Sequence, residues 1–517
     1  MKIALNFPML ETGGEKSTET RPAKVGPWLD GIGKRDVVTA ARHIGNALAA
    51  TNRLALGDSR RMELATLYWK AAGALWSPLS KRYAKSTQPL TGDAQEAARV
   101  AIELAIELSN AWKRLLGRES EKRIALGGQR LLAALVRRSL QSSGRVLINC
   151  YAAYSPVPQF TWHDLHAIYG YGRERDVHQT SLGSEAAEGT PERTPELMYV
   201  QSLLLALSNP YGCLPGQIES VLRYVQEYGH LAKLTDVVPI HRLAKAVAIV
   251  PTGHDFPPFS ASKGGSVQGS KMFLLTYDLA FQLQDQLAKL EGGADLPASI
   301  SRDVTLRRRQ LALLRRLLRQ WAIPPVRQFG SLASRGRVKL WAGLFGVWQG
   351  SRQAAGTTAS PGVDLPHPAT CQILNQTPGG YALRQVGAAT TPLRIGDLVN
   401  LEIEGRRGTQ AGIVRWFRNS PAIMGLEFGC ELLSDAPEAA TAALAEGSAS
   451  TPTPVMILPG EPTSRHAEPD QLIAPAGTFG VEQAVRVWRA GGILVAVLVK
   501  LVDMGPDFEI FEYVAVD

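Results

Sequence analysis

The sequence predicts an α+β multidomain protein, in which a large all-α helical region precedes a small antiparallel β-barrel with extra C-terminal strands. The length of 517 residues suits several domains, and 45% apolar with 20% charged residues is typical of a globular chain. Apolar residues recur at helical spacing from about residue 36 to 321. After residue 333, short β-branched and aromatic runs alternate with glycine turns, which predicts a small barrel.

The helical prediction rests on stripes of apolar residues at steps of three and four. In ARVAIELAIELSNAWKRLL one stripe contains Ala101, Leu104 and Leu108. Residues 1–35 are instead rich in glycine, proline and threonine, so we expect an irregular segment there. A helical domain is therefore predicted at 36–321.

Strand-like runs define the C-terminal part. The runs RVKLWAGLFGVWQ, CQILN, GYALRQV, LVNLEIEG, QAGIVRWFR and AIMGLEFGCELL predict a barrel at 333–434. A stretch rich in Ala, Ser, Thr and Pro at about 435–453 is predicted to be a linker. The strands expected at 453–517 either extend the same barrel or form a second β unit, and the pattern leaves both open.

Composition argues against a disulfide scaffold and against a membrane protein. The four cysteines lie far apart in sequence, which indicates reduced thiols rather than a zinc or redox motif. The apolar start of the chain is too short and too interrupted for a signal peptide, and the run GGILVAVLVKLV is too short to span a bilayer. We expect a cytoplasmic protein with no membrane segment.

Positive charge is concentrated in one stretch. The formal net charge is +9, and residues 302–339 contain ten arginines and one lysine against a single acid, Asp303. A local basic patch favours a small anionic ligand or an acidic partner surface, and it argues against DNA binding. The run RDVTLRRRQLALLRRLLRQW also has the pattern of an amphipathic helix, so its arginines equally suit a solvated helix face.

Motifs for catalysis are weak. His163 and His166 are three residues apart on a predicted helix, with Asp164 between them. A metal site needs a third ligand that the sequence does not show, so a polar helix face is the better interpretation. We predict that the protein is not an enzyme and has no catalytic residue, no metal and no cofactor.

The stretch CQILNQTPGGYALRQ, residues 371–385, carries the most specific feature. Between two expected strands, Asn375, Thr377 and Gly380 have the spacing N-x-T-x-x-G. Side chains two apart on a strand point the same way, so the amide and the hydroxyl can contact one ligand, and a glycine lets the backbone approach it or adopt positive φ. Asn and Thr also form turns by themselves, so the spacing alone leaves both interpretations open.

The motif and the strands after it resemble a PilZ domain, the bacterial receptor module for cyclic di-GMP, over residues 333–434. That family carries D/N-x-S-x-x-G after its second strand, and PLRIGDLVNLEI, QAGIVRWFR and MGLEFGCELL are similar to its later strands in order. The helical region before the barrel is similar to that of a group of proteobacterial PilZ proteins. The resemblance implies cyclic di-GMP as the ligand, bound by Asn375, Thr377 and Gly380.

The resemblance also implies a role for basic residues before the first strand, where the family carries R-x-x-x-R. Arginine suits this position because it binds phosphate with two hydrogen bonds and stacks on guanine. Here the strand begins ASRGRVKLW, in which Arg337 has Ala333 at the partner position and Arg335 has Lys339. Although this departs from the family pattern, the resemblance implies that Arg335, Arg337 and Lys339 bind the ligand.

The leading hypothesis is a cytoplasmic, non-enzymatic cyclic di-GMP effector whose helical region engages an unidentified protein partner. By the resemblance, its output would be motility, surface attachment or exopolysaccharide control. An alternative is an interaction scaffold with a degenerate barrel that no longer binds nucleotide. A third hypothesis is that the helical region has an enzymatic activity.

Overall fold

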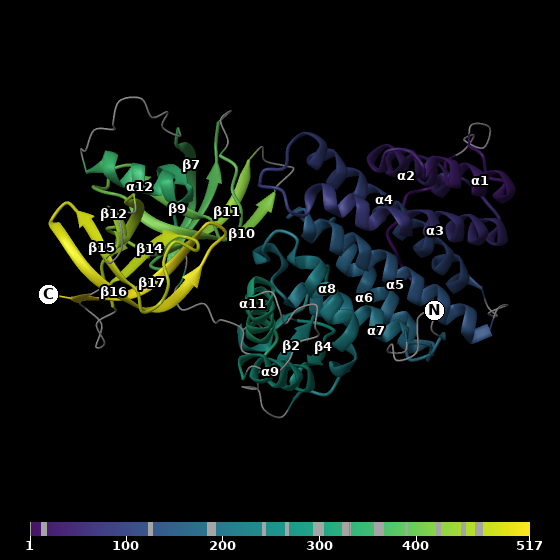
Figure 1. The fold of residues 1–517 in the computed structure, drawn as a ribbon. Coiled ribbons are helices and arrows are strands. Elements are labelled where there is room, and N and C mark those ends of the chain that lie inside the picture. The colour runs from purple at the N-terminus through teal and green to yellow at the C-terminus, as the bar shows by residue number, and fades with distance from the viewer. Residues whose placement is uncertain are drawn as a thin grey trace. The chain divides into compact units, whose positions relative to one another are not determined.

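The computed structural model contains two compact units. The described residues are 2–11, 18–122, 128–183, 193–239, 245–263, 268–292, 304–322, 330, 332–355, 367–387, 391–419, 425–445, 451–460 and 469–516. The helical unit comprises Met1–Ser86, Leu90–Pro210 and Gly216–Arg327, and the β unit comprises Thr87–Pro89, Tyr211–Pro215 and Gln328–Asp517. The long helices belong to the first unit and two barrels belong to the second (Figure 1).

The helical unit is built on amphipathic helices, as the sequence predicts. The helices are α1 (Pro22–Ile32), α2 (Val37–Arg53), α3 (Asp58–Tyr83), α4 (Gly92–Glu121), α5 (Gly128–Ala152), α6 (Thr161–Glu174), α7 (Pro195–Leu207), α8 (Gln217–Tyr228), α9 (Tyr277–Glu291) and α11 (Val304–Trp321), with short 3₁₀ turns at Pro210–Gly212, Gly229–Leu231 and Ala261–Lys263. The expected stripe is buried, since Leu104 and Leu108 are at most 1% exposed. The expectation of an irregular segment at 1–35 is wrong for α1, where Val25, Leu29 and Ile32 pack inward.

A small sheet corrects the expectation of an all-α region. Strands β1 (Lys233–Thr235), β2 (Val247–Val250), β3 (Phe259–Ser260) and β4 (Met272–Leu275) form an antiparallel sheet in the order β1-β4-β2-β3. Its strands have at most four residues, which is too short to show a clear period in the sequence. Thr276 anchors the sheet, because its hydroxyl lies 3.0 Å from the Ala246 carbonyl and 2.7 Å from that of Trp321.

The first barrel follows the helical unit and confirms the predicted antiparallel fold. Its strands are β5 (Leu332–Ala333), β6 (Arg337–Ala342), β7 (Ala369–Thr377), β8 (Gly380–Gln385), β9 (Leu398–Ile403), β10 (Gln410–Asn419) and β11 (Leu426–Ser434). Their order is β5-β7-β6-β9-β10-β11-β8, and a β7–β8 pairing closes the ring. Alternate side chains such as Leu340, Leu383 and Phe428 are fully buried in its interior.

A helix replaces part of a predicted strand. Of the run RVKLWAGLFGVWQ, residues 337–342 form β6, but α12 (Gly343–Ala354) begins directly after it. Gly343 adopts a positive φ of 75°, a conformation that turns the chain out of the strand and that other residues avoid. The helix buries Leu344 and Val347, which are spaced three apart.

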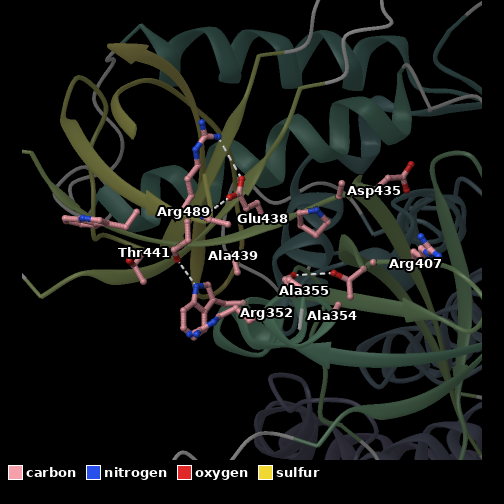
Figure 2. A pocket seen from close by; sticks show the side chains of 18 residues that line it. Arg352, Ala354, Ala355, Arg407, Asp435, Glu438, Ala439, Thr441 and Arg489 are labelled. Atoms are coloured by element: carbon pink, nitrogen blue, oxygen red, sulfur yellow. Dashed lines mark hydrogen bonds and ion pairs between the residues drawn. The ribbon is translucent and has the colours of Figure 1, made fainter. Parts of the chain in front are cut away.

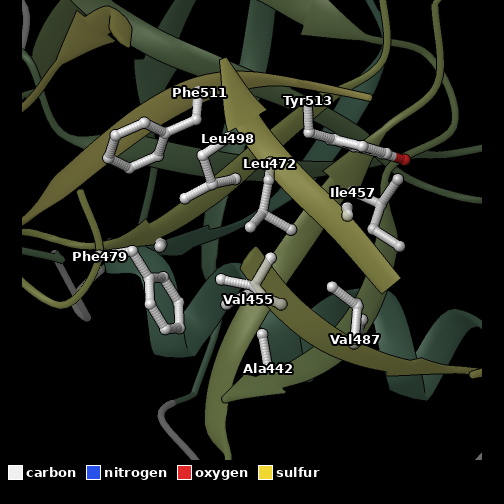
Figure 3. Close-up of a cluster of buried hydrophobic side chains, with 13 residues drawn as sticks. Ala442, Val455, Ile457, Leu472, Phe479, Val487, Leu498, Phe511 and Tyr513 are labelled. Atoms are coloured by element: carbon white, nitrogen blue, oxygen red, sulfur yellow. The ribbon is translucent and has the colours of Figure 1, made fainter. Parts of the chain in front are cut away.

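The C-terminal strands form a second, closed barrel. Its strands are β12 (Glu438–Leu444), β13 (Thr453–Leu458), β14 (Gln471–Pro475), β15 (Ala484–Arg489), β16 (Gly492–Met504) and β17 (Phe508–Val516), in the order β12-β13-β14-β17-β16-β15. Large side chains such as Leu472, Leu498 and Phe511 meet in its interior beside the small Ala442 (Figure 3). The linker expected at 435–453 is therefore wrong for β12, whose alanines are core residues.

The two barrels share a second apolar core, here called the inter-barrel core. It contains Leu344, Val347, Leu398, Ala411, Ile413, Met456, Leu458, Ile473, Phe508 and Ile510. In β13, Val455 and Ile457 point into the second barrel, whereas Met456 and Leu458 belong to the inter-barrel core. Strands β14 and β17 are divided between the two cores in the same alternating way. The barrels are thus packed into one body.

We predict that truncation in the inter-barrel core destabilises the whole β unit. Phe508→Ala should lower the free energy of unfolding by about 3–5 kcal/mol, because the side chain is 2% exposed and its removal leaves a cavity. Ile493→Ala, on the same barrel but 65% exposed, should change it by at most about 0.5 kcal/mol. Urea unfolding of the full chain measures both, and equal effects would contradict a shared core.

Candidate functional site

The predicted loop is a tight hairpin between β7 and β8. Thr377 pairs with Gly380, and Pro378 and Gly379 form the exposed turn. The Thr377 hydroxyl donates a hydrogen bond to the Gly380 carbonyl at 3.2 Å. The hydroxyl therefore stabilises the turn itself, as Ser/Thr turns do.

Gly380 is required by strand packing. A Cβ atom at this position would lie 2.1 Å from the Cys430 carbonyl oxygen on β11, far inside van der Waals contact. The amide of Leu432 also donates to the Gly379 carbonyl at 3.0 Å, which draws the turn against β11. The sequence predicted that this glycine lets the backbone approach a ligand or adopt positive φ. In the structure its φ is 155°, and the close approach is to β11.

Strand register places Asn375 and Arg337 on the same side of the sheet. Gln372 is opposite Arg337 on one side and opposite Arg384 on the other. Asn375 is opposite Ala382, two residues from Arg384 and therefore on the same face of β8. Asn375 is half-buried, Arg337 is exposed, and among the described residues the Asn375 amide group makes no hydrogen bond.

The same face continues across β11 and β10. Glu427 pairs with Arg384, and Gly429 pairs with both Ala382 and Trp416. Phe428, between these two positions, is fully buried, so Glu427 and Gly429 face outward. This surface, called the outer patch, consists of Arg337, Gln372, Asn375, Ala382, Arg384, Trp416, Arg418, Glu427 and Gly429.

Sequence reasoning missed Trp416 and Arg384 as members of this surface. A Cβ atom at Gly429 would lie 1.7 Å from the Trp416 indole nitrogen, so the indole lies directly over the glycine. Arg384 forms an ion pair with Glu427 at 2.5 Å, with both side chains largely buried. The alternation of β8 and β10 was the available signal, but bulges shift the register between Val414 and Trp416 and within β7.

The other two predicted cations lie at the margin of the outer patch. Arg335 is exposed in the link between β5 and β6. Lys339 is two residues beyond Arg337 on β6 and forms an ion pair with Glu402 at 3.0 Å. Of the three predicted basic residues, Arg337 therefore belongs to the outer patch, where it is opposite Gln372. Arg335 lies in the adjacent link, and the charge of Lys339 is already paired with Glu402.

A chain of hydrogen bonds leads from the hairpin to the junction of the barrels. Tyr381, next to Gly380, donates from its hydroxyl to the Gln410 side-chain oxygen at 2.9 Å and accepts from Arg406 at 3.3 Å. The Gln410 amide in turn donates to Asp435, which directly follows β11 and begins the link to β12. The hairpin is thus connected to the link that leads into the second barrel.

Both histidines lie on α6, but the expected polar helix face is wrong, because Asp164 and His166 are buried and only His163 is partly exposed. His166 is 2% exposed, and its ring nitrogens contact the Tyr199 hydroxyl at 2.6 Å and the Phe256 carbonyl at 2.9 Å. Burial lowers the pKa of His166 from 6.5 to about 4. Within the described ranges, no group of three His, Cys, Asp or Glu residues has a metal-binding arrangement.

The first barrel, with its hairpin motif, is a PilZ domain, as a family model shows. Residues 349–440 match the family model described as "Cyclic-di-GMP receptor FimW, middle PilZ domain". Residues 23–239 match the N-terminal domain of the same receptor, and residues 439–516 match its C-terminal β-barrel domain. The chain is therefore a PilZ-domain protein, as the resemblance in the sequence indicated.

One relative shares this organisation over most of its length. The chain is 22% identical over 495 residues to "Cyclic-di-GMP receptor FimW" of Pseudomonas aeruginosa PAO1, covering 82% of this chain and 80% of that protein. The described helices include none that is both long and apolar enough to cross a membrane.

We predict that the two glycines of the hairpin respond differently to substitution. Gly380→Ala should destabilise the β unit by about 1–3 kcal/mol, because β8 and β11 must separate to admit a methyl group. Gly379→Ala is the matched control, since a Cβ there has no neighbour within 4 Å. Thermal unfolding compares them, and a Gly380→Ala variant as stable as Gly379→Ala would contradict the packing role.

A pH dependence should come from His166. Because its folded pKa of about 4 lies below 6.5, the unfolded chain binds more protons between these values. The free energy of unfolding should therefore fall as the pH is lowered from about 6.5 toward 4, by up to about 3 kcal/mol.

Chemical unfolding at pH 7 and pH 4.5 should show a smaller pH effect in His166→Asn than in the wild type. His43→Asn, at an exposed position, should keep the wild-type dependence, and an unchanged dependence in His166→Asn would refute the assignment.

Proposed function

We propose that this protein is a non-enzymatic cyclic di-GMP effector that binds the nucleotide on the outer patch. The observation that carries the proposal is the register of β6, β7 and β8, which brings Arg337, Asn375 and Arg384 to one face. The similarity to a relative named as a cyclic di-GMP receptor supports the ligand. Helix-rich residues before the barrel are proposed to engage a protein partner.

The outer patch offers the contacts that this ligand requires. Cyclic di-GMP is a dianion, and the exposed Arg335 and Arg337 provide guanidinium groups that bind phosphate oxygens. The Asn375 amide can donate to and accept from a guanine edge. The Trp416 indole, half-exposed over Gly429, provides a surface on which a base can stack.

Thr377, Gly380 and Lys339 have supporting roles in this proposal. Thr377 closes the hairpin and keeps its hydroxyl lone pairs available for the ligand. Gly380 holds the hairpin against β11 and so fixes the position of Asn375. Lys339 lies at the rim, where its pair with Glu402 at 3.0 Å must open or be shared to contact a phosphate.

One observation favours the alternative, an interaction scaffold with a degenerate barrel. The Thr377 hydrogen bond and the tight packing of Gly380 account for two of the three motif residues without any ligand. Asn375 is the residue that neither turn formation nor packing explains. The two functions therefore differ most clearly in the role of Asn375.

Calorimetric titration of the full chain with cyclic di-GMP tests the proposal. Asn375→Ala should weaken binding by about 1–3 kcal/mol, the cost of leaving a ligand polar group without its partner. Replacing Arg335 and Arg337 together by Ala should abolish binding, and the wild-type affinity should fall as salt is raised. Gln376→Ala changes the neighbouring side chain on the opposite face and should leave the affinity unchanged.

Arg223→Ala is a control for the loss of an arginine in the helical unit, where this side chain hydrogen-bonds only Ser220 among the described residues. The scaffold alternative expects no heat from the wild type. A wild type that binds, with a double arginine variant that binds equally well, would refute the outer patch as the site.

A further inference from the structure

A cleft lies between the two barrels, away from the outer patch residues. It has a volume of about 590 Å³, which is within the range of ligand-binding sites. Its walls come from the end of α12, the turn between β9 and β10, the link before β12, and strands β12 and β15. All of these elements belong to the β unit.

The acidic side chains of the cleft already have partners. Asp435 accepts a hydrogen bond from the Gln410 amide. Glu438 accepts from the Ala490 amide at 3.3 Å and lies 3.9 Å from the Arg489 guanidinium. Arg489 thus partly balances the charge of Glu438, whereas Asp435 is hydrogen-bonded to a neutral amide and keeps its charge.

Two arginines of the cleft have no such partner. Arg352 lies over the Trp348 ring, with its guanidinium carbon 4.7 Å from the ring centroid, a contact with the π-system that takes no hydrogen-bond acceptor. Arg407 is exposed on the turn between β9 and β10. Among the described residues, neither guanidinium makes a hydrogen bond or an ion pair. With Arg489 beside Glu438, these two arginines stand against the single carboxylate of Asp435, so the net charge of the cleft is positive.

Figure 2 shows Arg407 well separated from Arg352, with Ala354 and Ala355 between them. A compact single anion would therefore meet one of the two arginines, whereas an elongated ligand can meet both. Small side chains line the space between them, which lets a backbone approach closely. Ser351 and Thr409, whose hydroxyls are 3.4 Å apart, are buried residues of the same wall.

The cleft is also rigidly held. Trp348 donates from its indole nitrogen to the Ala440 carbonyl at 2.7 Å, which ties α12 to β12. Trp348 and Ala439 pack against the inter-barrel core. A wall fixed in this way costs little ordering on binding, which favours recognition of a short segment.

We propose that the inter-barrel cleft binds an extended acidic peptide segment of a partner protein. Carboxylates of the peptide pair with Arg352 and Arg407, and its backbone lies along the alanine-lined wall between them. The proposal assigns a partner site to the β unit, and it does not depend on nucleotide binding at the outer patch.

Fluorescence anisotropy of labelled probe peptides tests the proposal on the full chain without nucleotide. The probes are acetylated peptides with two glutamates separated by two, three or four alanines, and the same peptides with glutamines. At least one glutamate probe should bind, and Arg352→Ala and Arg407→Ala should each weaken it by about tenfold or more. The glutamine probes should not bind, and Arg223→Ala should behave as the wild type.

Three results would overturn the proposal: no binding of any glutamate probe, equal binding in the arginine variants, or equal binding of the glutamine probes. A competition experiment with cyclic di-GMP tests whether the cleft binds the nucleotide instead. If cyclic di-GMP displaces the bound probe, and Arg352→Ala and Arg407→Ala abolish its own binding, the cleft is a nucleotide site instead. The two proposals can fail independently. Asn375→Ala tests nucleotide binding on the outer patch and should leave binding of the probe peptide unchanged.

Discussion

The β unit depends on three strands that are buried on both faces. In β13, β14 and β17 one set of alternate side chains fills the second barrel, and the other set packs against α12 and the first barrel. A one-residue slip in any of these strands would exchange the two sets and spoil both cores at once. This constraint fixes the two barrels as one body and creates the cleft where α12 ends beside β12.

The outer patch depends in the same way on register within the first barrel. Gly380 permits the closest approach between β8 and β11, and that pairing aligns Arg384 with Glu427 and Ala382 with Gly429. The motif residues thus have two kinds of role. Thr377 and Gly380 shape the hairpin, whereas Asn375 presents an amide that the fold itself does not use.

Much of the architecture could be predicted because the buried faces of helices and strands repeat apolar residues at a regular spacing. The stripe around Leu104 and the runs of the first barrel are regular enough to indicate helix and strand. The β1–β4 sheet was missed because its strands are short. Residues 343–349 were misread because an apolar run that packs between the two barrels shows no polar face. Trp416 and the cleft depend on bulges and on contacts between distant segments, which no local pattern encodes.

The central claim is that a nucleotide binds on the outer patch of the first barrel. Hydrogen–deuterium exchange of the full chain with and without cyclic di-GMP tests it most directly, because it locates the contact without any substitution. The account predicts slower exchange in the link before β6, in β7 near Asn375 and in β8 near Arg384. Unchanged exchange throughout the chain, or protection confined to segments outside the first barrel, would contradict it.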